Sequence, residues 1–409
     1  MKVTKQVYIY FGSYFFNAVS SFLIVALLTK YLTPHDYGII NLYSSFLIFL
    51  MPFISGGILY PLSADFFKKK GEGYAKHFSE AQVIPLISVL LFSVICVAFC
   101  YPLASFLRVT PVWVCLMPVS VWFLFINETS MMLARNKSQP WTFAGFSVGK
   151  NLTEMGLTIL LVIGMGLNWQ GRLSSAALAS FLFIFISGYF FYKWKVIENA
   201  IEWKNVRNIL WVSFPFIFER LSVFVLGYSD KYFIDKFDLK GTAEVGLYGL
   251  AGQLASIMFI VIISMNSAYQ PHLFRHLSEG HKKGFHKSTW LFLAACFLCM
   301  AGMFISFPIV YRYFIGAKFQ GAFWYSYALT GGYFMWGIYN AFLAYLIYFS
   351  KNRQILYISL LGMIISLMLN FLLVPRFGAW GAAYASITTY SLMGLICFLF
   401  ARKFLISKS

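Results

Sequence analysis

The sequence predicts an all-α polytopic membrane protein: twelve transmembrane helices form two six-helix halves of parallel topology around a central cavity. Three observations lead to this class. The chain is 60% hydrophobic and only 11% charged, whereas soluble proteins average roughly 25% charged residues. Its apolar residues come in blocks long enough for a helix to cross a bilayer, which takes about 20 residues. Finally, related motifs recur about halfway along the chain, which indicates a duplication.

The apolar blocks define twelve spans. The first is a membrane helix rather than a cleaved signal peptide, because its apolar run continues to Leu28 and no small-residue cleavage site ends it. We expect the spans at residues 7–29, 38–62, 81–104, 112–133, 140–166, 173–192, 209–233, 244–269, 288–314, 322–349, 354–374 and 379–401.

The distribution of basic residues predicts the orientation. With the N-terminus in the cytoplasm, the cytoplasmic segments hold 21 Lys and Arg and the outer loops hold 8, among them Arg172. Positive charge concentrates on the cytoplasmic side of membrane proteins, so both termini should be cytoplasmic. The net charge of +18 follows from this topology and implies no nucleic-acid partner.

The two halves repeat with the same direction through the membrane. Lys30 corresponds to Lys236, and Gly38 to Gly246. Each half has an even number of spans, so we expect an axis along the membrane normal with the functional site between the halves.

The predicted halves are residues 1–192 and 209–409, joined by a cytoplasmic amphipathic linker at 193–208. Trp194, Ile197 and Ile201 share one face of a helix in this linker, which predicts an interfacial helix.

Charged residues within spans are the candidate site. Glu219, Arg220, Lys150 and Glu154 fall near mid-span, where an ionisable group costs at least ~2.5–3.5 kcal/mol and usually faces a bundle interior or a wet cavity. The alternative is structural: an ion pair between Lys150 and Glu154 four residues on, or one between Arg220 and Glu154.

Three further positions lie nearer the span ends. Glu128 is close to a cytoplasmic end. Asp230 and Lys231, with Asp235, lie close to an outer end, where side chains can reach water. Glu219 and Arg220 correspond to uncharged residues of the first span, so the architecture alone does not require their charge.

Three segments carry a family resemblance: TKYLTPHDYGIINLYSSF at 29–46, DKYFIDKF with EVGLYGLAGQLA at 230–255, and LNFLLVPRFGAWGAAYASI at 369–387. In this order and spacing they resemble the polysaccharide transporter family, which includes the Wzx-type O-antigen flippases and belongs to a superfamily with multidrug exporters and lipid II flippases.

The resemblance implies a non-enzymatic flippase of the bacterial inner membrane. It would move an undecaprenyl-pyrophosphate-linked oligosaccharide, such as an O-antigen repeat unit, from the inner to the outer leaflet by alternating access. Its partners would be membrane lipid, a polysaccharide polymerase and a chain-length regulator, and no cofactor or metal is implied. The pyrophosphate would bind Arg220, Lys150 and Lys231. Ion coupling would fall to the acids Glu219, Glu154, Glu128 and Asp230.

Two other functions stay open. A cation-coupled multidrug exporter of the same fold would use the acids and the many tyrosines. A membrane polysaccharide polymerase or ligase would need a sizeable outer loop, and the predicted outer loops are short. The chain has no G-x-x-x-x-G-K-[ST] motif for nucleotide binding.

Overall fold

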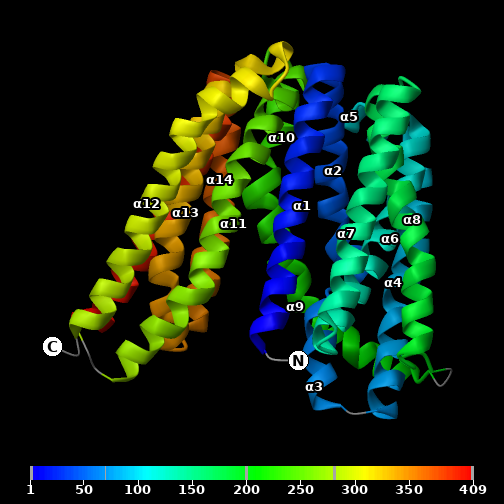
Figure 1. The fold of residues 1–409 in the computed structure, drawn as a ribbon, viewed down its shortest axis with the longest axis horizontal. Helices are drawn as coiled ribbons and strands as arrows, with labels where there is room; N and C mark the ends of the chain where they lie inside the picture. The colour runs from blue at the N-terminus through cyan, green and yellow to red at the C-terminus, as the bar shows by residue number, and fades with distance from the viewer. Residues whose placement is uncertain (1–2, 70, 199–200, 280–281, 407–409) are drawn as a thin grey trace. The chain divides into compact units, whose positions relative to one another are not determined.

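The computed structural model describes residues 3–69, 71–198, 201–279 and 282–406. It confirms the all-α class, since these ranges contain helices and no strand (Figure 1). In chain order the elements are α1 (Val3–Tyr31), α2 (Pro34–Ser55), α3 (Leu59–Lys68), α4 (Glu72–Ala98), α5 (Cys100–Leu107), α6 (Pro111–Asn136), α7 (Pro140–Thr158), the π-helix η1 (Ile159–Gly164), α8 (Asn168–Lys193), α9 (Trp203–Tyr228), α10 (Asp230–Phe237), α11 (Thr242–Ser278), α12 (Lys282–Tyr313), the 3₁₀-helix η2 (Ala317–Ala322), α13 (Phe323–Tyr348), α14 (Asn352–Phe377) and α15 (Ala379–Ile406).

Each predicted span overlaps a long helix, and the spans 38–62, 81–104 and 209–233 also run into the short helices α3, α5 and α10. Among the described residues, eleven helices are long and apolar enough to cross a membrane, and α13 accounts for the remaining span. This helix has 26 residues and no charged side chain, but it contains six Tyr and two Trp. Such rings pair an apolar body with a polar tip, so they lower the mean hydropathy of a helix that can still lie in lipid.

The chain forms two compact units. The first comprises residues 1–32 and 42–224, and the second comprises residues 33–41 and 225–409. These boundaries differ from the predicted halves, which remain a prediction, because most of α9 packs with the first unit. Gly57, in a turn with φ of +70°, lets the backbone of Ser213 approach closely, and Phe224 lies 5.2 Å from Phe49 between ring centroids.

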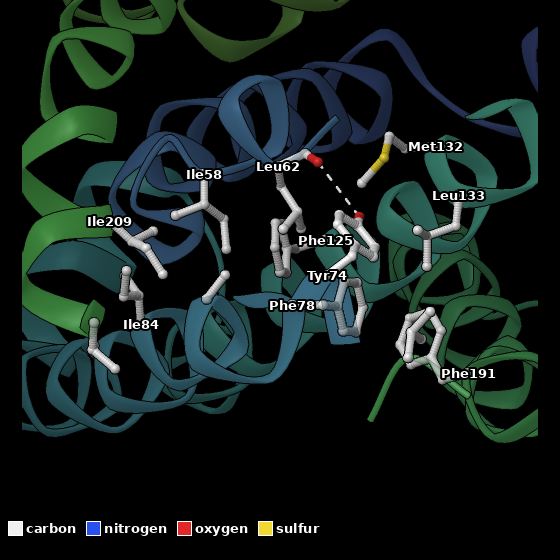
Figure 2. Packing of buried hydrophobic residues seen from close by; sticks show 13 residues of the cluster. Ile58, Leu62, Tyr74, Phe78, Ile84, Phe125, Met132, Leu133, Phe191 and Ile209 are labelled. Atoms are coloured by element: carbon white, nitrogen blue, oxygen red, sulfur yellow. Dashed lines mark hydrogen bonds between the residues drawn. The ribbon is translucent and has the colours of Figure 1, made fainter. Parts of the chain in front are cut away.

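The first unit has an apolar core at one end of its helices (Figure 2). Ile58 and Leu62 from α3 and the turn before it meet Phe78 of α4, Phe125 of α6 and Phe191 of α8. All five side chains are almost fully buried. Because side chains from four helices interlock here, the loops that leave this end of the unit have a rigid base.

In the second unit, the starts of α2 and α11 cross at the two glycines paired by the repeat. A Cβ on Gly38 would lie 1.8 Å from the carbonyl oxygen of Thr242, and a Cβ on Gly246 would lie 1.9 Å from that of Pro34. The contact is reciprocal, since Pro34 and Thr242 are themselves separated by the offset of Gly38 and Gly246. Contacts of this form arise across a two-fold axis, which supports the predicted parallel repeat.

The interfacial helix predicted in the linker is wrong for the described residues. Residues 194–198 and 201–202 are not helical, and residues 199–200 lie outside the described residues. Instead the chain turns at Lys195, whose φ is +49°, and the backbone N–H of Glu198 donates to the hydroxyl of Ser79 at 2.7 Å. Tertiary contacts with α4 therefore outweigh the amphipathic pattern.

Candidate functional site: a charged cluster in the first unit

Glu154 of α7 is the centre of an ion-pair network. Its Oε1 accepts a hydrogen bond from Nη1 of Arg172 on α8 at 2.6 Å, and its Oε2 lies 3.9 Å from Nζ of Lys150. The side chains of Lys150, Glu154 and Arg172 are 18%, 19% and 21% exposed. The predicted pair between Lys150 and Glu154 therefore exists, but the shorter bond of Glu154 goes to Arg172.

Arg172 is the main residue that the sequence analysis missed, because it was placed in an outer loop. The turn before α8 comes earlier, at Gly166 and Asn168, which both have positive φ. Gly171 then packs against Leu161, since a Cβ there would lie 3.0 Å from its backbone. Glycine and asparagine are typical of turns. A turn predicted at Gly166 and Asn168 would have placed Arg172 in the first turns of the following helix.

The Thr158 hydroxyl contacts the Arg172 guanidinium, and the Ser175 hydroxyl contacts Thr158. The hydroxyl of Thr158 donates to the backbone carbonyl of Glu154 at 2.7 Å and accepts from Arg172 at 3.4 Å. The same hydroxyl lies 2.8 Å from that of Ser175. The network thus joins α7 to α8 where α7 passes into the π-helix η1.

Arg220 of α9 has a different environment. Its Nη2 donates to the hydroxyl of Tyr60 on α3 at 2.8 Å, and its guanidinium lies 4.7 Å above the centre of the Tyr60 ring. The Glu219 carboxylate is 3.7 Å from its Nε, and the two side chains are 43% and 53% exposed. Arg220 is therefore positioned by an aromatic ring and remains accessible to a ligand. Tyr60 was not predicted, and the ion pair between Arg220 and Glu154 is absent.

Glu128 of α6 is the third of the predicted site carboxylates in the first unit, and it is exposed on that unit. The neighbouring Asn127 is buried and donates to the carbonyl of Ser180 on α8 at 3.1 Å. We call the set Glu128, Lys150, Glu154, Arg172, Glu219 and Arg220 the charged cluster.

Asp230 and Lys231 belong to the second unit and have partners there. Helix α9 ends at Tyr228 and α10 begins at Asp230, so the single span predicted through 233 is broken. Asp230 is only 8% exposed and accepts a hydrogen bond from the Tyr248 hydroxyl at 2.8 Å. The expectation that Asp230 reaches water at a helix end is therefore wrong: this carboxyl is packed against tyrosines.

Lys231 lies beside the same break. Its Nζ donates to Oδ1 of Asn41 at 3.2 Å and lies 5.1 Å from the centre of the Tyr228 ring. Nearby, Asp235 accepts a hydrogen bond from Thr242 at 2.6 Å. These contacts hold α10 against the starts of α2 and α11. Lys231 thus has a packing role in the second unit, and its predicted contact with a ligand remains a prediction.

The charged cluster combines three cations with three carboxylates in one unit. Arginine presents a planar fork of donors that matches carboxylate and phosphate oxygens alike. Each cation of the cluster has a carboxylate within 4 Å, and the six groups carry no net charge when all are ionised. Within the described residues no group of three or more His, Cys, Asp or Glu could hold a metal ion.

Comparison with known families assigns the chain. The family described as polysaccharide biosynthesis protein matches residues 3–277, which is well over half of the sequence. The chain belongs to the polysaccharide biosynthesis protein family. This confirms the resemblance seen in the three sequence segments.

Two relatives of this family member come from Haemophilus influenzae strain Rd. One, an uncharacterized membrane protein, is 25% identical over 61% of this chain and 62% of its own length. The other, Lsg locus putative protein 1, is 22% identical over 89% of this chain and 90% of its own length. The chain thus spans less than two thirds of the first relative and nearly all of the second.

Solved structures show that this family member has a transporter fold. An inward-facing multidrug resistance MATE family transporter of the MOP superfamily has a TM-score of 0.71 and 12% identity, covering 97% of this chain and 95% of the transporter. The lipid II flippase MurJ, in an inward closed conformation, also has a TM-score of 0.71, with 16% identity over 96% of this chain and 87% of MurJ. The protein is therefore a multi-pass membrane protein with the fold of MOP-superfamily transporters.

Proposed function

We propose that the protein is a flippase that moves an undecaprenyl-pyrophosphate-linked oligosaccharide from the inner to the outer leaflet of a bacterial inner membrane by alternating access. Family membership supports the polysaccharide context, and the likeness to MurJ supports a lipid-linked cargo. The observation that carries the proposal is Arg220, a cation inside a membrane helix, held by Tyr60 but 43% exposed.

The charged cluster offers a mechanism for pyrophosphate capture. Before the cargo binds, Glu219 holds Arg220 at 3.7 Å and Glu154 holds Lys150 at 3.9 Å. Phosphate oxygens would replace these carboxylates as acceptors, because charge-assisted bonds from an arginine fork to phosphate are strong and bidentate. Lys150, at the edge of ion-pair distance from Glu154, is the cation that moves toward the ligand at least cost. The displaced carboxylates can then take up protons or cations, which would couple transport to an ion.

The driving force needs no nucleotide. An inside-negative membrane potential pushes anions outward with about 2.3 kcal/mol per charge per 100 mV. The head group requires a wet path lined by polar groups, whereas the polyprenyl tail can remain in the hydrocarbon of the bilayer.

The test is reconstitution of the purified protein into liposomes that contain the polyprenyl-pyrophosphate-linked oligosaccharide. We expect the protein to make the glycan of the inner leaflet accessible to an external glycosidase. Arg220→Ala should slow this step about tenfold or more, the scale of a lost hydrogen bond to a charged group. Arg220→Lys should recover part of the rate, because the charge remains while the bidentate geometry is lost.

The matched control is Arg207→Ala, which removes an exposed arginine from the same helix α9 and should leave the rate near wild type. Glycan that stays inaccessible with the wild-type protein would overturn the proposal. The multidrug exporter would be the better function if the same liposomes instead transported a cationic dye in exchange for sodium ions or protons that move down their gradient. The carboxylates of the cluster and the likeness to the MATE transporter keep that second candidate in view.

A further inference from the structure

A cavity whose lining shares no residue with the charged cluster lies at the end of the first unit that carries the core of Figure 2. It has a volume of about 490 Å³, and three lysines and three aromatic rings line it. They come from the end of α3, the start of α4, the turn between α6 and α7 and the turn after α8. We call it the three-lysine cavity, and its lining side chains are Phe66, Lys69, Tyr74, Lys137, Trp194 and Lys195.

The aromatic walls are rigid. The rings of Phe66 and Tyr74 meet edge to face with centroids 5.0 Å apart, and Tyr74 donates from its hydroxyl to the carbonyl of Leu62. Phe66 and Trp194 pack against the core cluster. Trp194 also donates from Nε1 to the side chain of Gln139 at 3.2 Å, so the turn after α8 is tied to the turn before α7.

The lysines give the cavity a positive charge that its lining does not neutralise. No carboxylate is among the lining residues. Nζ of Lys137 lies 5.6 Å from the centre of the Phe66 ring and 5.9 Å from that of Trp194, and burial lowers the pKa of this lysine. Lys69 has a further partner, because its Nζ lies 2.8 Å from Nδ1 of His77, whose Nε2 lies 2.9 Å from the Asp65 carboxylate. A bound anion would therefore offset the charges of Lys137 and Lys195, since the lining of the cavity supplies no carboxylate for them.

The backbone at Lys195 adds an independent indication. Lys195 has φ of +49°, in the left-handed region, where a helix usually ends on glycine. A non-glycine residue in this region costs of order 1–3 kcal/mol, and such residues cluster at ligand-binding sites. The turn presents the Lys195 ammonium to the cavity despite that cost.

The surroundings of the cavity distinguish a lipid from a soluble anion. Phe67, Tyr192 and Ile197, each beside a lining residue or within two positions of one, are 68%, 82% and 58% exposed. Exposed apolar side chains at the rim suit acyl chains, whereas a free phosphate ion would use neither them nor the aromatic walls. Basic pockets at the ends of transmembrane helices bind phosphate head groups from the bilayer surface.

We propose that the three-lysine cavity binds the phosphate head group of an anionic phospholipid, with the lysines at the phosphate and the aromatic rings against the glycerol. The site is separate from the charged cluster and does not depend on the proposed cargo.

The experiment measures lipid binding to the full purified chain in detergent by native mass spectrometry and by thermal stabilisation. Phosphatidylglycerol is compared with phosphatidylcholine of the same acyl chains, and inorganic phosphate and pyrophosphate form two further arms. We expect phosphatidylglycerol to bind and stabilise the wild type, with little effect from the other three. Lys137→Ala and Lys195→Gly should each weaken phosphatidylglycerol binding roughly fivefold, the factor that corresponds to about 1 kcal/mol per lysine at a membrane surface.

Lys195→Gly separates binding from folding. Glycine accepts the left-handed backbone at no steric cost, so without lipid this variant should be at least as stable as the wild type. The matched control is Lys193→Ala, two residues away at the end of α8, whose exposed lysine lies over Tyr189 and does not line the cavity. Equal binding of the two phospholipids, unchanged binding in both cavity variants, or equal stabilisation by a soluble phosphate would each overturn the proposal.

Discussion

At the scale of single residues, the partners of a buried charge decide its role. Glu154 and Arg172 share a bond of 2.6 Å in a site where both side chains are about one-fifth exposed. Arg220 instead depends on the hydroxyl and ring of Tyr60 and is more than twice as exposed. We therefore expect Glu154 and Arg172 to matter for stability and Arg220 for ligand binding.

The first residue-scale prediction concerns this pair. Arg172→Gln should destabilise the protein by on the order of 3 kcal/mol, because breaking a buried ion pair leaves a charge without compensation. The double variant Glu154→Gln, Arg172→Gln should recover part of this loss, since no carboxylate is left without Arg172, while Lys150 loses its weaker partner at 3.9 Å. Thermal unfolding of the purified variants in detergent measures both effects. An Arg172→Gln protein as stable as the wild type would mean that Lys150 alone compensates Glu154.

At the scale of elements, close approach between helices depends on a few glycines. The starts of α2 and α11 meet at Gly38 and Gly246, where each missing Cβ leaves room for the other helix's backbone carbonyl. Asn41 packs over Gly249 one turn further along. Neither backbone can move aside without shifting a whole helix, so this crossing leaves no room for a larger side chain.

Gly38→Ala and Gly246→Ala should accordingly be damaging to similar degrees. Overpacking of this kind costs about 1–3 kcal/mol and occasionally more. Because the added methyl group would meet a backbone carbonyl in both variants, we expect a cost at the upper end of this range. Gly12→Ala is the control, because a Cβ at Gly12 of α1 meets nothing within 4 Å and alanine favours a helix by about 0.5–1 kcal/mol over glycine. Amounts of folded protein in the membrane, measured by fluorescence-detected chromatography, should fall for the first two variants only. Wild-type amounts of either would contradict the reciprocal crossing.

At the scale of the whole molecule, the charges of the loops predict the orientation in the membrane. The three segments that converge at the three-lysine cavity are all loops predicted to be cytoplasmic, and they are rich in lysine. Helices α3, α4, α6, α7 and α8 each begin or end beside these loops. This is expected when successive helices cross the membrane in opposite directions, because alternate loops then lie on the same side.

We predict that this end is cytoplasmic, as are both termini. Reporter fusions after Lys137 and Ser409 should give a cytoplasmic signal, and fusions after Lys240 and Lys318 should give a periplasmic one. The physical reason is the excess of Lys and Arg in the short loops on one side. A periplasmic signal at Lys137 would reverse the orientation and place the three-lysine cavity in the outer leaflet.

The sequence by itself determined the features that depend on local periodicity and composition: the membrane class, the position of nearly every span, the repeat and the pair Lys150 and Glu154 four residues apart. These follow from the length of apolar runs and from helix geometry, which neighbouring residues encode. The sequence also predicted that Gly38 and Gly246 occupy equivalent positions of the repeat. It did not predict that the two helices meet at these glycines.

Only the tertiary structure decided which charges meet. Arg172 reaches Glu154 from another helix, Arg220 meets Tyr60 across 160 positions of sequence, and Asp230 is buried against Tyr248 rather than exposed at a helix end. Tertiary contacts also decided the conformation of the linker, whose residues 194–198 are not helical despite their amphipathic pattern. A contact between helices depends on the rotation and depth of both, which many residues set together, so no local pattern specifies it.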